Sequence, residues 1–79
     1  MKELVELVEY VARGLVDHPD QVKVTESVDR DTVFLELQVA PGEAGRVIGR
    51  EGRLANALRT LLRISAARSR KRVVLDIRV

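Results

Sequence analysis

The stretch Val47-Ile48-Gly49-Arg50-Glu51-Gly52-Arg53 places two glycines three residues apart, directly after an apolar pair. An arginine lies between the glycines, and Arg46 and Arg53 flank the stretch. Glycines at this spacing let two helices meet at a turn whose backbone comes very close to an outside group. Because helix N-termini and arginines both favour anions, the pattern predicts that this turn contacts nucleic-acid phosphates.

Apolar spacing on either side of the turn predicts three helices and three strands. The segment before Pro19 is predicted to be an amphipathic helix, because apolar residues recur there at steps of three or four: Leu4, Leu7, Val8, Val11 and Leu15. Residues 22–28 and 32–39 alternate between apolar and polar positions, which predicts an antiparallel hairpin with one buried face. A short helix over about 43–48, a long helix over about 53–68 and a last strand over 73–79 should follow.

This order, α-β-β-α-α-β, predicts an α+β fold: a two-layer sandwich in which helices cover one face of a three-stranded mixed sheet. The strands before and after the helix pair should be parallel and joined by a right-handed crossover. The chain ends within the last strand, so we expect that strand at a sheet edge. Residues 1–79 are expected to form a single domain, and dimerisation is a common way for so small a core to bury more surface.

Spacing within the two later helices predicts which side chains face the core. On the long helix the predicted core-facing residues are Leu54, Leu58, Leu61, Leu62 and Ser65. Arg59 and Arg63 are four residues apart and are expected to share an outer stripe. Of the adjacent residues Val47 and Ile48, at least one should lie in the core, because neighbouring helical side chains point in different directions.

The net charge of +2 conceals a strong asymmetry along the chain. Residues 1–45 carry four basic and ten acidic side chains, a net charge of −6, whereas residues 46–79 carry ten basic and two acidic ones, a net charge of +8. Nine of those ten bases lie between residues 46 and 72, and eight of the nine are arginine, which suits bidentate phosphate contacts. Such a run is ordinarily a solvated helix face, but its position beside the glycine turn favours a polyanionic partner.

On these residues the chain resembles the KH domain family. The signature of that family is an apolar-Ile-Gly-x-x-Gly core between two helices, which residues 47–52 match. The element order is similar to the type II arrangement of bacterial KH domains, and the resemblance covers essentially the whole chain. One departure is Ala55, since many KH domains have isoleucine three residues after the second glycine.

The resemblance implies a single-stranded RNA-binding protein, an RNA chaperone or post-transcriptional regulator, that grips about four nucleotides through the Gly-x-x-Gly loop. Loop amides would bind phosphates, and bases would lie in a groove between the helix pair and the last strand. Glu51 is expected to interact with the N-terminus of the long helix instead. The expected RNA-binding residues are Arg46, Val47, Ile48, Gly49, Arg50, Glu51, Gly52, Arg53, Ala55 and Arg59.

Three other interpretations stay open. The first is a protein-interaction subunit of a complex with a larger KH-domain-containing partner, for which RNA contact is secondary. For either function the resemblance implies a link to cell elongation and envelope growth, and a homodimer or a heterodimer with that larger protein. The second is a helix-turn-helix that binds duplex DNA, although only Arg53 and Asn56 among residues 53–56 are polar enough to read bases. The third is a plain tight turn between two helices.

Composition argues against several further classes. Cysteine is absent and His18 is the only histidine, so we expect no metal and no cofactor. The chain has neither a nucleotide-binding glycine loop nor an activated nucleophile, and we expect no enzymatic activity. Apolar runs fall short of the roughly 18 residues that span a bilayer. Acidic residues interrupt the N-terminal segment, which argues against a signal peptide. A cytoplasmic location without membrane insertion is therefore expected.

Overall fold

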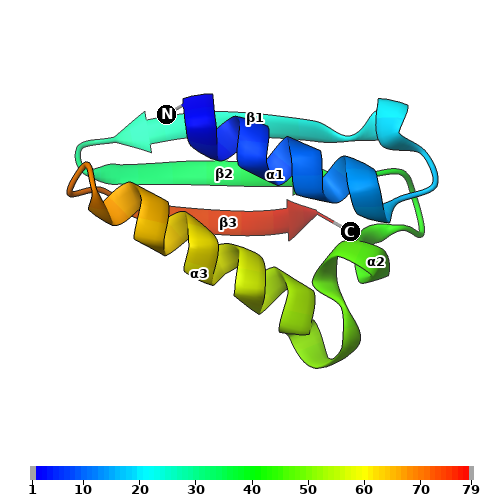
Figure 1. The fold of residues 1–79 in the computed structure, drawn as a ribbon. Helices are drawn as coiled ribbons and strands as arrows, with labels where there is room; N and C mark the ends of the chain where they lie inside the picture. The colour runs from blue at the N-terminus through cyan, green and yellow to red at the C-terminus, as the bar shows by residue number, and fades with distance from the viewer. Residues whose placement is uncertain (1, 79) are drawn as a thin grey trace.

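Helices cover one face of a three-stranded sheet in the computed structural model, which describes residues 2–78 (Figure 1). The predicted element order and the α+β, type II KH-like class are confirmed. Val79, expected at the end of the last strand, lies outside the described residues. The elements are α1 (Lys2–Leu15), β1 (Lys23–Asp29), β2 (Thr32–Gln38), α2 (Ala44–Ile48), α3 (Arg53–Ala67) and β3 (Arg72–Arg78), with short 3-10 turns at Pro19–Gln21 and Arg50–Gly52.

The sheet has the order β1-β2-β3, with β2 in the centre. β1 and β2 form the predicted antiparallel hairpin, in which Asp29 lies opposite Thr32 at the turn. β2 and β3 are parallel, with Leu35 opposite Leu75. The expected edge position of β3 is confirmed, so the outer side of this strand faces α3 and solvent rather than another strand (Figure 1).

The core lies between the sheet and the two long helices. β2 presents alternate residues to this layer, as a half-buried strand must, and the helices present residues about one turn apart. The buried residues of these elements are Leu4, Val8 and Ala12 from α1, Val33, Leu35 and Leu37 from β2, Leu58, Leu62 and Ala66 from α3, and Leu75 from β3. A chain of this size depends on this one cluster for most of its stability.

The buried side of α3 differs from the prediction. Leu58 and Leu62 are buried as expected, but Leu54 and Leu61 are exposed and Ser65 is half-buried. The other buried positions are Ala55 and Ala66, and their small side chains let the helix backbone lie close to the sheet. Close approach leaves room for only a narrow buried stripe, so the leucines on its flank remain at the surface.

The predicted buried face of the hairpin is also less complete on β1 than on β2. Val24 is half-buried and Val28 is exposed, although Val28 lies opposite the buried Val33. β1 is an edge strand, and its outer side has no neighbouring strand that shields the side chains.

Leu61 and Leu62 provide a matched test of this helix orientation. Leu62 is 0% exposed and Leu61 is 51% exposed, although both were predicted to face the core. Leu62→Ala should lower the free energy of unfolding by about 2–5 kcal/mol, because it leaves a cavity in the core. Leu61→Ala should change it by about 0.5 kcal/mol or less, as expected for a surface position. Chemical denaturation measures both, and equal effects would contradict the orientation of α3.

Candidate nucleic-acid interface

Gly49 ends α2 in a backbone conformation that only glycine adopts readily. Its φ is 78° and its ψ is 174°, in a region from which residues with a side chain are excluded. Its amide donates to the Gly45 carbonyl at 2.9 Å, which closes the last turn of α2. A Cβ at Gly49 would lie 2.8–3.0 Å from the side chain and backbone nitrogen of Leu54. Glycine is therefore required here by backbone angle and by space.

Gly52 is left-handed as well but less constrained. Its φ of 76° and ψ of 12° lie in the left-handed helical region, and a Cβ would meet only Asn56 Nδ2, at an ordinary 3.7 Å. Glu51 between the glycines also has a left-handed φ of 57°. Gly52 precedes α3 and has no side chain to cap it, so the positive end of this 15-residue helix lies at the loop, where the Arg53 amide donates to the Arg50 carbonyl.

The three arginines of this region do not converge on one point. Arg50 and Arg53 are exposed at the loop, where Arg53 Nη2 lies 3.8 Å from Glu51 Oε2. Both members of that pair are more than 70% exposed, so it contributes little to stability. Arg46 instead donates to Asp17 Oδ1 at 2.9 Å, on the side of α2 that faces the end of α1. Two of the three guanidinium groups are thus at the loop.

The expected apolar floor is mostly enclosed. Val47 is 1% exposed and Ala55 is 2% exposed, so neither has appreciable surface for a ligand. Ile48 is half-buried and packs against the core, which confirms that at least one residue of the apolar pair is internal. Val47 and Ala55 therefore support the loop from within.

A groove of about 410 Å³ runs between α3 and the outer edge of β3. Its lining residues are Asn56, Arg59, Thr60, Leu62, Arg63, Val73, Val74 and Leu75. Arg59 does not project outward as predicted: its Nε and Nη2 donate to the Leu75 carbonyl at 3.4 and 3.2 Å. Arg63 is exposed beside it and donates from Nη2 to Thr60 Oγ1 at 3.3 Å. The groove therefore places two cations next to a sheet edge.

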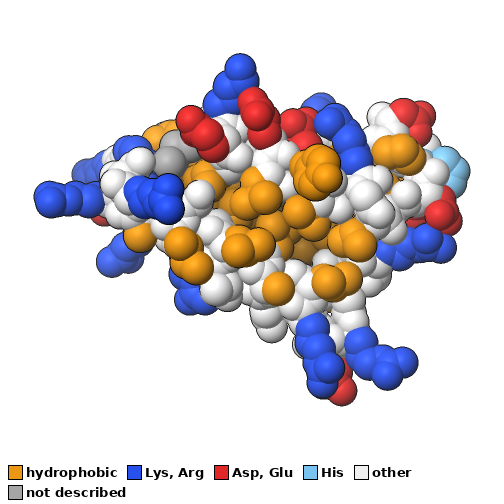
Figure 2. Space-filling view, viewed as in Figure 1, with side chains coloured by type: hydrophobic (Ala, Val, Ile, Leu, Met, Phe, Trp, Pro, Cys, Tyr) orange, Lys and Arg blue, Asp and Glu red, His pale blue; other side chains and the backbone are white. Residues whose placement is uncertain are grey.

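Basic side chains gather at two places on the face that carries the helices. Figure 2 shows Lys and Arg at the projecting turn between α2 and α3, and again at the opposite end, over the link between α3 and β3. The second group consists of Arg68, Arg70, Lys71 and Arg72. The basic run of the sequence is thus divided by the length of α3, and only its first part lies at the glycine loop.

Comparison with known sequences identifies the family of this chain. A family model described as "KhpA/KhpB, KH domain" matches residues 5–77. The chain belongs to this KH-domain family. It is 49% identical over 77 residues to the RNA-binding protein KhpA of Aquifex aeolicus, with 98% of each chain covered. It is 46% identical over 72 residues to KhpA of Clostridium acetobutylicum, covering 91% of this chain and 96% of that one.

A further relative is similar to this chain in identity and coverage. The RNA-binding protein KhpA of Treponema pallidum is 50% identical over 72 residues, which cover 91% of this chain and 90% of that protein. The family agrees with the α+β, type II KH-like fold of the structure.

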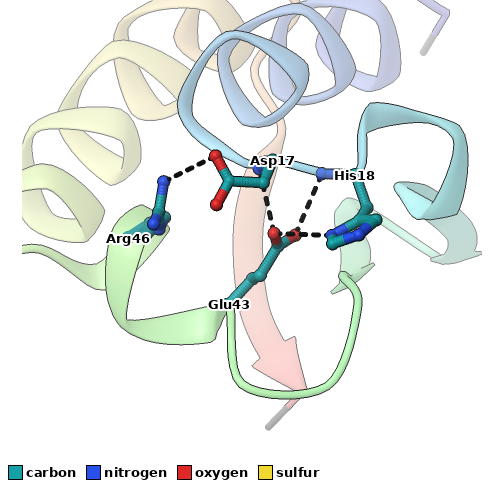
Figure 3. Close-up of polar contacts among 4 residues, drawn as sticks. All are labelled: Asp17, His18, Glu43 and Arg46. Atoms are coloured by element: carbon teal, nitrogen blue, oxygen red, sulfur yellow. Dashed lines mark hydrogen bonds and ion pairs between the residues drawn. The ribbon is translucent and has the colours of Figure 1, made fainter.

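A polar cluster beside the loop has no counterpart in the sequence analysis. Glu43 is buried, and Figure 3 shows its carboxylate between Asp17 and His18. Glu43 Oε1 accepts from the Asp17 amide at 2.9 Å and contacts His18 Nδ1 at 2.9 Å, while Oε2 accepts from the His18 amide at 3.4 Å. With the Arg46–Asp17 pair, these contacts form what we call the Glu43 clasp, made of Asp17, His18, Glu43 and Arg46.

The clasp holds the start of α2 against the end of α1. α2 has only five residues, too few for a helix to be stable alone. Burial alone would raise the pKa of Glu43, but hydrogen bonds from His18 and from two amides outweigh it and hold that pKa below its ordinary value. The Glu43 carboxylate in turn raises the pKa of His18. Among the described residues, no cluster of three His, Cys, Asp or Glu suits a metal ion.

No helix within residues 2–78 is both long and apolar enough to cross a bilayer.

The two glycines should respond differently to the same substitution. Gly49→Ala should lower the free energy of unfolding by at least about 2 kcal/mol, because it combines a disallowed backbone angle with overlap against Leu54. Gly52→Ala should cost about 1 kcal/mol, the penalty of a left-handed residue with space around it. Thermal or chemical unfolding measures both, and equal costs would contradict the loop geometry described here.

The clasp predicts a pH optimum for stability. A raised folded pKa means that the contribution of His18 is complete below its ordinary pKa of 6.5 and is lost as pH rises through the raised value. A lowered folded pKa means that the contribution of Glu43 is complete above 4.5 and is lost as pH falls through the lowered value. The clasp should therefore stabilise most between these two pH values.

Comparison of the wild type with His18→Gln tests this. The difference in melting temperature between the two should be largest between pH 4.5 and 6.5 and should shrink at higher pH. A difference that does not change across this range would show that the imidazole charge plays no part.

Proposed function

We propose that this KH domain binds single-stranded RNA through the Gly49–Gly52 loop and the adjoining α3–β3 groove. The observation that carries the proposal is the loop itself: two positions without side chains lie beside the positive end of α3, which no side chain caps, and Arg50 and Arg53 are exposed there. The names of the relatives, RNA-binding protein KhpA, agree with this function.

The loop suits the sugar-phosphate backbone. Gly49 and Gly52 present no Cβ, so a phosphate can approach the main chain closely. Their own amides already donate to the Gly45 and Gly49 carbonyls, so the attraction for the phosphate comes mainly from the charges around the loop. The positive end of the α3 dipole points toward the same place, and arginines supply the charge that a polyanion requires. KH loops of this kind clamp about four nucleotides. Val47 and Ala55, which are buried, would hold the loop in shape rather than contact RNA.

The groove suits unpaired bases. β3 is an edge strand, so main-chain groups on its outer side are free of a neighbouring strand and can pair with base edges. A duplex keeps its base edges turned inward, whereas a single strand can lay them into this groove. Duplex DNA is a poorer fit, because Ala55 is buried and Leu54 is apolar at the start of α3, where a recognition helix needs polar residues.

In the cell, such a module would act as an RNA chaperone or post-transcriptional regulator in the cytoplasm, without enzymatic activity. The link with cell elongation and envelope growth rests on the family resemblance alone. One loop that holds a few nucleotides binds weakly, so pairing with a second RNA-binding module would raise avidity.

A second candidate function is assembly with a larger KH-domain-containing protein, or with a second copy. The observation that favours it is an apolar surface on the helices, where Tyr10 is 81% exposed and Leu54, Leu61 and Ile64 are also exposed. Figure 2 shows hydrophobic side chains across the centre of this face, with both acidic and basic ones along its upper border. On α1 the pairs Lys2–Glu6 and Arg13–Glu9 balance each other, so this surface has no excess of positive charge for RNA and a protein is the better occupant.

A change of charge in the loop tests the RNA proposal. Replacement of Arg50 and Glu51 together by Asp should abolish RNA binding, a loss of at least about tenfold, because two carboxylates then face the phosphates. Aspartate tolerates the left-handed φ of 57° at position 51, so the fold should persist. Fluorescence anisotropy with a labelled single-stranded RNA measures the affinity.

Arg70→Asp is the matched control. Arg70 is exposed, also has a left-handed φ, of 54°, and lies beyond the far end of α3, so this variant has the same net charge as the loop variant. It should retain most of the affinity. Equal loss in both variants would show that RNA follows net charge rather than the loop. Wild-type binding should also weaken with salt, and a salt-insensitive complex would favour the protein-assembly function.

A further inference from the structure

Arg59 occupies the part of the groove where a base would meet the sheet edge. Its Nε and Nη2 both donate to the Leu75 carbonyl, at 3.4 and 3.2 Å, and its Nη1 donates to Asn56 Oδ1 at 3.5 Å. Its side chain is half-buried in the groove wall, so these contacts hold the guanidinium group over the outer side of β3. Arg59 thus covers one main-chain acceptor of the edge strand.

The contacts of Arg59 leave only donors at this point of the edge. A carbonyl oxygen has two lone pairs, and two N–H groups fill them. In an extended strand the N–H and C=O of one residue point to the same side, so the Leu75 amide faces the groove as well. Consistent with this alternation, the amide of Arg72, three residues earlier, points to the other side and donates to Asp31 at 2.7 Å.

The guanidinium group adds further donors. Its three contacts with the described residues use three of its five N–H groups. One N–H on Nη1 and one on Nη2 are left for a ligand. A base at this place therefore meets these two N–H groups, the Leu75 amide and a positive charge. The nearest main-chain oxygen, that of Leu75, is already paired.

Bases differ in how they satisfy such a surface. An unoccupied strand residue offers one donor and one acceptor, which match N1 and the amino group of adenine. When the acceptor is filled, that amino group has no partner and faces other donors, which costs free energy. O6 and N7 of guanine are two adjacent acceptors for the same donors, and paired acceptors of this kind suit a guanidinium group.

We propose that Arg59 is a specificity-determining residue that makes the α3–β3 groove select guanine over adenine. The inference rests on the proposed function, because it needs a base in this groove. It adds a role for one side chain: Arg59 selects the base by filling the Leu75 carbonyl and by offering its remaining N–H groups.

The wild-type protein provides the first test. The octamers UGUUGUUG and UAUUAUUA have the same backbone and the same uracils, and they differ only in the purine, guanine or adenine. Wild type should bind the guanine octamer about tenfold more tightly than the adenine octamer in fluorescence anisotropy at a fixed salt concentration, the discrimination typical of one well-made bidentate contact. Equal affinities, or tighter binding of the adenine octamer, would overturn the proposal. Failure to bind either octamer would instead overturn the proposed function.

Two variants then separate specificity from charge. Arg59→Met keeps most of the aliphatic stem and frees the Leu75 carbonyl, so the ratio of the affinity for the guanine octamer to that for the adenine octamer should fall at least about fivefold. Arg63→Met removes an equal charge from the same groove, but Arg63 contacts Thr60 rather than the strand. It should weaken both octamers and leave the ratio within about twofold of wild type.

The pattern of the two variants decides the matter. A fall in the ratio for Arg59→Met alone supports the proposal. An unchanged ratio in Arg59→Met, or the same fall in both variants, refutes it while leaving RNA binding by the loop intact. Circular dichroism melts of each variant check that it is folded, and the wild-type comparison stands without them.

Discussion

The fit of Leu54 against the bare main chain of Gly49 is the contact on which the candidate interface depends. Leu54 occupies the space that any side chain at position 49 would need. Its side chain is exposed on its outer part, so it does not serve the core as the neighbouring Ala55 does. The result is a corner in which α2 ends and α3 begins within a few residues, so that the N-terminus of α3 lies next to a main chain without side chains.

Such a corner needs support from outside itself. Gly49, Glu51 and Gly52 all have positive φ, and α2 is too short to be stable alone. Val47 anchors α2 from one side through the core, and the Glu43 clasp anchors its start to the end of α1. Glu43 is therefore a buried charge with an organising role: its carboxylate accepts from two successive amides where α1 has ended. Both ends of α2 are thus fixed by contacts outside the loop.

Sequence patterns predicted the elements well because each is encoded locally. Alternation specified β2 and β3, apolar spacing specified α1, and the glycines marked the boundary between α2 and α3. The exposure of Leu54 and Leu61 could not be read in this way, because it depends on how closely Ala55 and Ala66 bring α3 to the sheet. The sequence did not reveal the Glu43 clasp, because Glu43 and its partner His18 are 25 residues apart. A glutamate beside Pro41-Gly42 also resembles an ordinary loop residue.

The directions of the arginine side chains could not be predicted from the sequence for the same reason. Composition identified a basic half of the chain, but charge counts contain no direction. In the folded protein Arg46 turns to Asp17, Arg59 turns to the Leu75 carbonyl, and the group after α3 lies at the opposite end. Arg46 and Arg59 are each held by an acceptor that is distant in sequence, so only the fold decides which guanidinium groups face a ligand. Arg50 and Arg53 remain exposed at the loop, where Arg53 pairs with the neighbouring Glu51. The geometry of the glycine corner thus determines the electrostatics of the interface as well as its shape.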